Sequence, residues 1–234
     1  MHGRASVVPS GPAHESYVAA RAPAVWARRR CPVIDRAAIA LLQPGLHRLA
    51  AIVVRWGIGA DTVTLFGFGL GLAAALAIAL GSPLAGLALL LASRLMDGLD
   101  GAVARLTQPT DRGAFLDITL DFLFYASIPL AFALADPAAN ALPGAVLLAA
   151  FIGTGSSFLA FALLAERRGL KSQDYPQKGI YYLGGLTEAG ETLLCFALMC
   201  LWPAHFAWWA YGFAALCAVT IGTRLLAGWH ALRL

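Results

Sequence analysis

Six long apolar segments, separated by short polar loops, dominate the chain of 234 residues. As helices, all six are long enough to cross about 30 Å of hydrocarbon. The chain is 59% hydrophobic and only 13% charged, whereas a soluble domain has about 25% charged residues. The pattern therefore predicts an all-α polytopic membrane protein with six transmembrane helices. The predicted spans cover residues 62–80, 83–105, 114–135, 141–165, 180–202 and 206–228.

The first 57 residues differ from these spans. Residues 1–35 are rich in Pro, Gly, Ser and Arg, and we expect a disordered, basic N-terminal tail. In residues 36–57, after a proline suited to a first helical turn, apolar positions recur with helical spacing: Leu46, Leu49, Ala50, Val53 and Trp56. This favours an amphipathic helix lying in the membrane interface, although a helix packed on its own protein would carry the same pattern. Residues 58–234 would then form the six-helix transmembrane domain.

Positive charge gathers in alternate loops. The loops at 81–82, 136–140 and 203–205 carry no Lys or Arg, whereas 105–112 and 166–178 are basic. By the positive-inside rule, we expect both termini and the two basic loops to face the cytoplasm, with a bacterial inner membrane as the location. The formal net charge of +4 is small, and nucleic acid is not an expected partner.

Four aspartates interrupt the apolar pattern where the second predicted span ends and the third begins. Asp97 and Asp100 are three residues apart and Asp117 and Asp121 are four apart, so each pair lies on one face of a helix. Carboxylates are costly inside a membrane and mark functional sites by default. Four that face a shared point need a cation, and their oxygens suit a hard divalent ion. The sequence therefore predicts a divalent metal site that opens toward the cytoplasm.

The residues around these aspartates follow the pattern D-x-x-D-G-x-x-A-R and then, after a short spacer, G-x-x-x-D-x-x-x-D. This is the signature of the CDP-alcohol phosphotransferase family, which the chain resembles over roughly residues 44–228. Every fixed position of the signature is present: Asp97, Asp100, Gly101, Ala104, Arg105, Gly113, Asp117 and Asp121.

The resemblance implies a transferase of phospholipid biosynthesis. Such an enzyme transfers a substituted phosphoryl group from a CDP-linked donor, usually CDP-diacylglycerol, to an alcohol acceptor, and it releases CMP. The resemblance also implies two bound Mg²⁺ or Mn²⁺ ions, which would screen the diphosphate and stabilise the charge that develops on CMP. It further implies that the protein forms a homodimer and contacts membrane lipid.

The same resemblance gives roles to individual residues. Asp97, Asp100 and Asp117 would ligate metal, while Asp121 would share the metal site and take the proton of the acceptor hydroxyl as general base. A weaker match lies before the first span, where residues 60–64 correspond to a Pro-Asn-x-x-Thr stretch of the family and suggest a nucleotide contact for Thr64. The other implied CDP-binding residues are Gly101, Ala104, Arg105 and Gly113.

The sequence leaves the acceptor side of the reaction open. Glu188 and Glu191 lie in the predicted span 180–202, and they either line an acceptor pocket or pair structurally with Arg94 or Arg224. The second basic loop could bind a phosphorylated acceptor or serve the topology alone; its candidate residues are Arg167, Arg168 and Lys178. The signature concerns the CDP half of the reaction, so it does not identify the acceptor or separate CDP-diacylglycerol from a soluble CDP-alcohol.

Two other functions also use clustered carboxylates in a membrane protein. A membrane prenyltransferase also binds a diphosphate through aspartates and magnesium, but it carries two separate acidic motifs and more spans. A divalent-cation or proton-coupled transporter would place its carboxylates near the membrane midplane, on broken helices and between repeats. Here the acids form one block near a cytoplasmic helix end, without an internal repeat, which favours the transferase.

Overall fold

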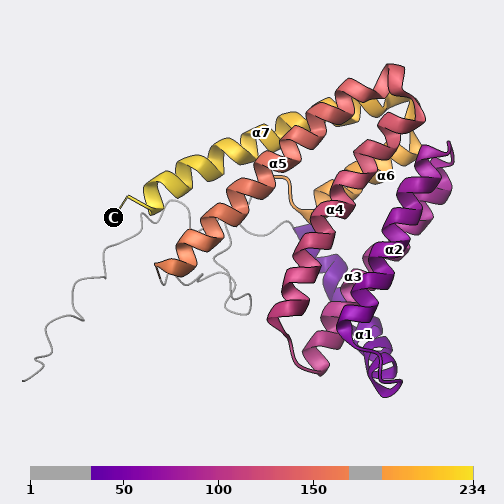
Figure 1. Ribbon diagram of the computed structural model, residues 1–234, viewed down its shortest axis with the longest axis vertical. Coiled ribbons are helices and arrows are strands. Elements are labelled where there is room, and N and C mark those ends of the chain that lie inside the picture. Colours follow the sequence, from indigo (N-terminus) through magenta and orange to yellow (C-terminus); the bar gives the residue numbers. More distant parts are fainter. Residues whose placement is uncertain (1–32, 169–185, 234) are drawn as a thin grey trace, which may run out of the picture. The chain divides into compact units, whose positions relative to one another are not determined.

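The computed structural model describes residues 33–168 and 186–233, and these residues are helical apart from short connections (Figure 1). No strand occurs within these two ranges, so the all-α class is confirmed. The helices are α1 (Val33–Arg55), α2 (Ala60–Ala79), α3 (Pro83–Leu106), α4 (Asp111–Ala135), α5 (Pro137–Arg167), α6 (Ala189–Leu201) and α7 (Phe206–Ala231), with a short 3₁₀ turn, η1 (Pro203–His205), before α7.

Short connections join α2, α3 and α4 into one packed unit. Gly81 closes the α2–α3 turn with a φ of +80°, a left-handed conformation that glycine adopts without steric cost. Pro83 then occupies the first turn of α3, where its missing N–H costs no hydrogen bond. Thr110 caps α4 by accepting a hydrogen bond from the Gly113 N–H at 3.0 Å. Both α3 and α4 pack against α2.

An aromatic core joins α4 to the later helices. Phe124 of α4 is fully buried and meets Phe196 of α6 edge-on, with their ring centroids 6.5 Å apart. Further along, Phe132 stacks on Phe206 of α7 at 4.7 Å. Such pairs add to the free energy gained from burying the rings. They fix the face of α4 that is turned toward α6 and α7.

The amount of exposed apolar surface fits a lipid environment. Four of the described helices, namely α2, α4, α5 and α7 with η1, are long and apolar enough to span a bilayer. Along α2 alone, Leu65, Phe66, Leu72 and Leu76 are 47–60% exposed, which would be unfavourable in water. The protein is therefore an integral membrane protein. The count of six spans stays a prediction, because α3 carries three charged residues in its second half and only 13 residues of α6 are described.

Helix α1 occupies the predicted amphipathic segment but begins earlier. It runs from Val33, so Pro44 lies inside it and not in its first turn. Ala50 is fully buried in a small core with Leu99 and Val103 of α3, whereas Trp56 is 74% exposed. The helix thus packs on its own protein along part of its apolar face. Its position in the membrane interface stays a prediction, and residues 1–32 lie outside the described part of the chain.

Helix α6 corrects the predicted fifth span. The sequence suggested a helix over residues 180–202, whereas the described helix begins at Ala189, and residues 180–185 lie outside the described ranges. Glu188 and Glu191 consequently stand at the start of α6 and not in the middle of a span. The physical reason is local, since both side chains take part in a capping box that satisfies backbone N–H groups of the first turn.

Candidate metal centre and its pocket

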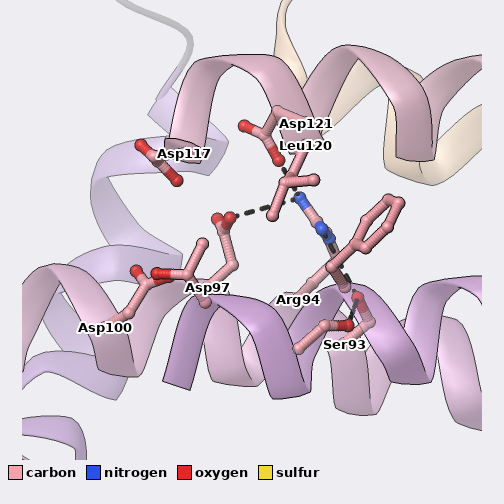
Figure 2. Close-up of a pocket in the computed structure, with 10 residues that line it drawn as sticks. Ser93, Arg94, Asp97, Asp100, Asp117, Leu120 and Asp121 are labelled. Carbon is pink, nitrogen blue, oxygen red and sulfur yellow. Dashed lines mark hydrogen bonds and ion pairs between the residues drawn. The ribbon is translucent and has the colours of Figure 1, made fainter. Parts of the chain in front are cut away.

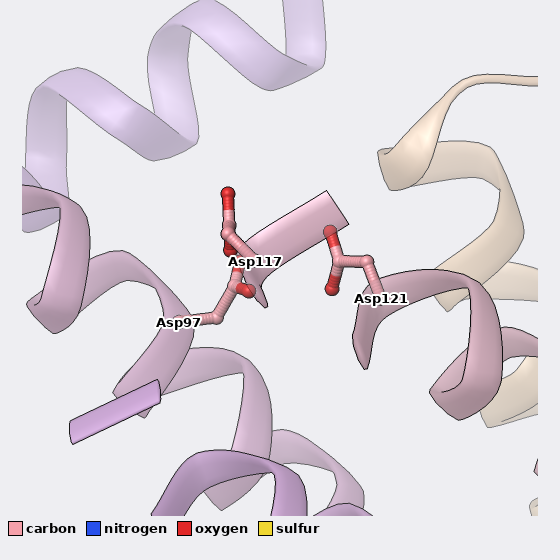
Figure 3. A group of neighbouring side chains, drawn as sticks. All are labelled: Asp97, Asp117 and Asp121. Atoms are coloured by element: carbon pink, nitrogen blue, oxygen red, sulfur yellow. The ribbon is translucent and has the colours of Figure 1, made fainter. Parts of the chain in front are cut away.

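The aspartates converge because α3 ends and α4 begins at the same place. Asp97 lies near the end of α3 and Asp117 near the start of α4, and residues 107–110 form the connection between the helices. One carboxylate oxygen from each of Asp97, Asp117 and Asp121 lies within 4.8 Å of the other two. Figure 3 shows these three side chains grouped between the two helices. The spacing of each pair along its helix turns both members toward the facing helix.

A pocket surrounds this cluster and includes the fourth aspartate. Asp100 is only 6% exposed, and its Oδ2 atom is buried without a hydrogen-bond partner among the described residues. A buried carboxylate oxygen without a partner is costly, so this atom is suited to a cation. The pocket (Figure 2) is lined by Thr64, Gly67, Phe68, Ser93, Arg94, Asp97, Asp100, Asp117, Leu120 and Asp121.

These donors fit a divalent metal ion. Hard cations such as Mg²⁺, Mn²⁺ and Ca²⁺ prefer oxygen ligands, and the cluster offers three converging carboxylates with a fourth beside them. Carboxylates packed this closely repel one another strongly in a poorly solvated site. The arrangement is therefore stable only with positive charge nearby.

One positive charge is already supplied by Arg94, a residue outside the family signature. Its Nη1 donates to Asp121 Oδ1 at 2.7 Å and lies 3.4 Å from Asp97 Oδ1. Figure 2 shows dashed lines from the guanidinium to both carboxylates. The predicted pairing of Arg94 with Glu188 or Glu191 is therefore wrong, because Arg94 pairs with Asp97 and Asp121. An arginine in an apolar helix one turn before Asp97 was the signal that could have revealed this.

Packing holds Arg94 in place. Its Cζ lies 3.9 Å from the centroid of the Phe124 ring, a cation–π contact. Phe124 in turn fits against Gly71 of α2, where an added Cβ would lie 2.6 Å from Phe124 Cδ2. Ser93, next to Arg94, is fully buried and donates to the Gly67 carbonyl at 2.7 Å. The glycines of α2 therefore give α3 and α4 the close approach that the site requires.

The other signature residues lie beside the pocket and do not line it. Gly101 is half-buried, and an added Cβ would lie 3.3 Å from the Nη1 atom at the far end of the exposed Arg105 side chain. Ala104 is half-buried and Arg105 is exposed. A Cβ added to Gly113 would lie 3.2 Å from Asp61 Oδ1 and 3.2 Å from Thr110 Oγ1. Gly101, Ala104 and Arg105 follow Asp100 on α3, and Gly113 precedes Asp117 on α4.

The weaker sequence match on α2 divides into two parts. Thr64 lines the pocket with the aspartates, and its hydroxyl donates to the Ala60 carbonyl at 3.0 Å. Asp61, which stands where the family has Asn, forms an ion pair with Arg112 at the start of α4. Asp61 thus ties α2 to α4 outside the pocket.

The candidate acceptor residues do not line this pocket. The Glu188 N–H donates to Glu191 Oε2 at 3.1 Å within the capping box, so both glutamates have a structural part in starting α6. Arg168 donates to the Leu232 carbonyl at 2.9 Å, and Arg167 is exposed. Lys178 lies outside the described residues. An acceptor role for any of them stays a prediction.

The match to a family model identifies the chain. Residues 58–223 match the model of the CDP-alcohol phosphatidyltransferase family. The matched region includes the metal centre, helices α2 to α6 and most of α7. The chain belongs to this family. The resemblance deduced from eight signature positions is therefore confirmed, and the protein is an enzyme of the phosphatidyltransferase type.

Two sequence relatives agree with this assignment. The chain is 51% identical over 201 residues to the inner membrane protein YnjF of Escherichia coli, covering 86% of this chain and 98% of the relative. It is 44% identical over 94 residues to archaetidylinositol phosphate synthase of Methanothermobacter thermautotrophicus, covering 39% of this chain and 48% of that protein.

The fold also matches solved structures. Phosphatidylinositol phosphate synthase (PgsA1) of Mycobacterium tuberculosis with CDP-DAG bound has a TM-score of 0.65 and 23% sequence identity, covering 79% of this chain and 93% of that chain. The same enzyme with manganese and citrate has a TM-score of 0.64 and 23% identity, covering 79% and 88%. At this identity the comparison shows a shared fold.

Proposed function

We propose that this phosphatidyltransferase transfers a substituted phosphoryl group from CDP-diacylglycerol to an alcohol acceptor and releases CMP. The observation that carries the proposal is the convergence of Asp97, Asp117 and Asp121 oxygens within 4.8 Å, in one pocket with Asp100. The CDP-DAG complex of the mycobacterial enzyme with the same fold supports the donor. The manganese complex of that enzyme supports a divalent ion.

Asp97, Asp100, Asp117 and Asp121 would hold two divalent ions, Mg²⁺ or Mn²⁺. When bound, such ions neutralise the diphosphate and stabilise the charge that develops on the departing CMP. The protein's own contribution is geometric, because α3 and α4 fix the carboxylates before the substrate arrives. A site with preformed charges needs little reorganisation during the reaction.

Asp121 would act as the general base toward the acceptor hydroxyl. Its Oδ1 accepts a hydrogen bond from Arg94, which orients the carboxylate. The Oδ2 atom would then accept the hydroxyl proton, and the alcohol oxygen would attack the phosphorus as the bond to CMP breaks. Asp117, one helical turn earlier, lies within 4.8 Å of Asp121 and would keep the acceptor close to the metals.

The cytidine and phosphate portions of the donor would bind along the rim formed by α2, α3 and α4. Gly101 lets a ligand approach the backbone of α3 closely, and Arg105 beside it offers a planar guanidinium for phosphate. The small side chain of Ala104 and the absence of one at Gly113 would leave room for the donor, and Thr64 offers a hydroxyl within the pocket. These five roles extend the family signature to this chain residue by residue.

The acceptor and the setting complete the proposal. Because one relative is an archaetidylinositol phosphate synthase and one structural neighbour a phosphatidylinositol phosphate synthase, an inositol phosphate is the first acceptor to test. We further propose a homodimer in a bacterial inner membrane, with both termini and the metal centre facing the cytoplasm.

CMP release and lipid product analysis test this reaction. Purified protein in detergent would be given CDP-diacylglycerol, Mn²⁺ and separate acceptors, namely inositol phosphate, glycerol phosphate, inositol and serine. The proposal expects CMP and a new phospholipid with one acceptor, loss of both in Asp121→Asn, and near-normal rates in Asp111→Asn, whose exposed carboxylate lies at the start of the same helix. Absence of CMP with every acceptor, in protein that remains folded, would refute the proposed donor or acceptor class.

A further inference from the structure

Arg94 carries the positive charge among the ten residues that line the aspartate pocket. Its guanidinium contacts Asp97 and Asp121, at 3.4 and 2.7 Å, and these are two of the three aspartates whose oxygens converge. The arginine therefore occupies the side of the cluster where an ion bridging these two carboxylates would bind. The family signature has no counterpart for this charge, because Arg94 precedes its first aspartate.

The guanidinium is held firmly in this position. One face lies 3.9 Å above the Phe124 ring, its side chain is 12% exposed, and Phe124 itself is fully buried. The Nη2 atom lies 3.4 Å from Ser93 Oγ, which is anchored to α2. Closely packed interiors resist such rearrangement, so Arg94 cannot easily swing away from the cluster when a metal ion binds.

We infer that Arg94 is a positioning residue that serves as a built-in cation of the aspartate cluster. Its fixed positive charge weakens binding of the divalent ion between Asp97 and Asp121. This inference rests on the metal site proposed above. The repulsion between like charges is large at short distance in a poorly solvated site. With Arg94 present, four carboxylates and two divalent ions carry a net positive charge. That excess attracts the anionic diphosphate of the donor, so the more weakly held ion would bind fully only together with the donor.

A manganese titration tests this inference without measuring catalysis. Free Mn²⁺ would be followed by electron paramagnetic resonance as it is added to metal-free wild-type protein, Arg94→Gln and Arg112→Gln. We expect the Kd of the weaker Mn²⁺ site to fall at least ten-fold in Arg94→Gln. Arg112→Gln is the matched control, because Arg112 pairs with Asp61 outside the pocket, and its Kd should stay within two-fold of wild type.

Thermal unfolding supplies a second reading. Without metal, Arg94→Gln should unfold at a lower temperature than wild type, since the aspartates lose their counter-charge, and saturating Mn²⁺ should close most of that gap. A gap that Mn²⁺ does not narrow would mean that Arg94 acts only through its packing on Phe124, and it would overturn the inference.

The outcomes separate this inference from the proposed function. Equal or weaker Mn²⁺ binding in Arg94→Gln than in wild type would overturn the role of Arg94 as a built-in cation. The proposed metal site would still stand if wild type binds Mn²⁺ and Asp117→Asn does not. Absence of any Mn²⁺ binding that depends on Asp117 would overturn both. If Arg94→Gln does not fold, Arg94→Met replaces it, because methionine removes the charge and keeps a flexible unbranched chain against the Phe124 ring. Its Kd should also fall at least ten-fold, and an unchanged or higher Kd would overturn the inference.

Discussion

Replacing Gly71 by alanine should disturb the metal centre from the far side of Phe124. Gly71 lies on α2, and an added Cβ would sit 2.6 Å from Phe124 Cδ2 and 3.2 Å from Ser93 Oγ. Carbon atoms in contact normally stay about 3.5–4.0 Å apart, so the ring would have to move by roughly 1 Å. Phe124 has little room for this, because its other side contacts Arg94 and Phe196.

The expected cost follows from two opposing effects. Overpacking of a well-packed core costs about 1–3 kcal/mol, while exchanging glycine for alanine inside a helix returns up to about 1 kcal/mol. A 2.6 Å approach places the overpacking cost in the upper part of that range, about 2–3 kcal/mol. The net destabilisation should then be about 1–2 kcal/mol, which corresponds to roughly 2–8 °C in unfolding temperature for a chain of this size. A displaced Phe124 would also carry Arg94 away from Asp121, so CMP release should fall together with stability.

Gly69→Ala provides the matched control. Gly69 lies two residues away on the same helix, is exposed, and has nothing within 4 Å of an added Cβ. It should leave stability unchanged or slightly raised and CMP release unaffected. Scanning fluorimetry in one detergent and a CMP assay would compare both variants with wild type. If Gly71→Ala proved as stable and active as Gly69→Ala, the account of how α2 positions Phe124 and Arg94 would be wrong.

Two further predictions concern helix starts. Thr110→Ala removes the helix cap that accepts a hydrogen bond from the Gly113 N–H, and it should destabilise the protein by about 0.5–2 kcal/mol. The control is Thr119→Ala, at an exposed site on the same helix, which should shift the unfolding temperature far less. Equal shifts in the two variants would argue against the cap. Glu191→Ala breaks the capping box with Glu188 and should lower the unfolding temperature with an unchanged acceptor KM. Glu191→Gln, which can still accept the hydrogen bond, should lose less stability, and a raised acceptor KM in either variant would favour the acceptor-pocket role.

Much of the fold could be predicted from hydropathy because the lipid environment enforces it. The predicted spans at 83–105 and 206–228 differ from α3 and α7 by only a few residues, since backbone polar groups inside a bilayer must be satisfied within a helix. The fifth span was the exception. Hydropathy alone does not distinguish the capping glutamates at the start of α6 from polar residues within a span, and the capping box became evident only from the contacts of Glu188 with Glu191.

The site was predictable to the extent that it is local in sequence. The spacings of Asp97 with Asp100 and Asp117 with Asp121 gave each pair a shared helix face, and the structure brings both pairs into one pocket. The role of Arg94 was not predictable in the same way. It depends on Phe124 and Gly71, which lie on two other helices, and no local spacing links residues so far apart along the chain.

The metal requirement of CMP release tests the central claim most directly. Purified protein would be stripped of metal with a chelator, given CDP-diacylglycerol and its best acceptor, and assayed for CMP before and after Mg²⁺ or Mn²⁺ is restored. The account predicts no CMP without metal, recovery on metal addition in wild type, and no recovery in Asp117→Asn. CMP released at an undiminished rate in excess chelator, or at the wild-type rate in Asp117→Asn, would contradict it.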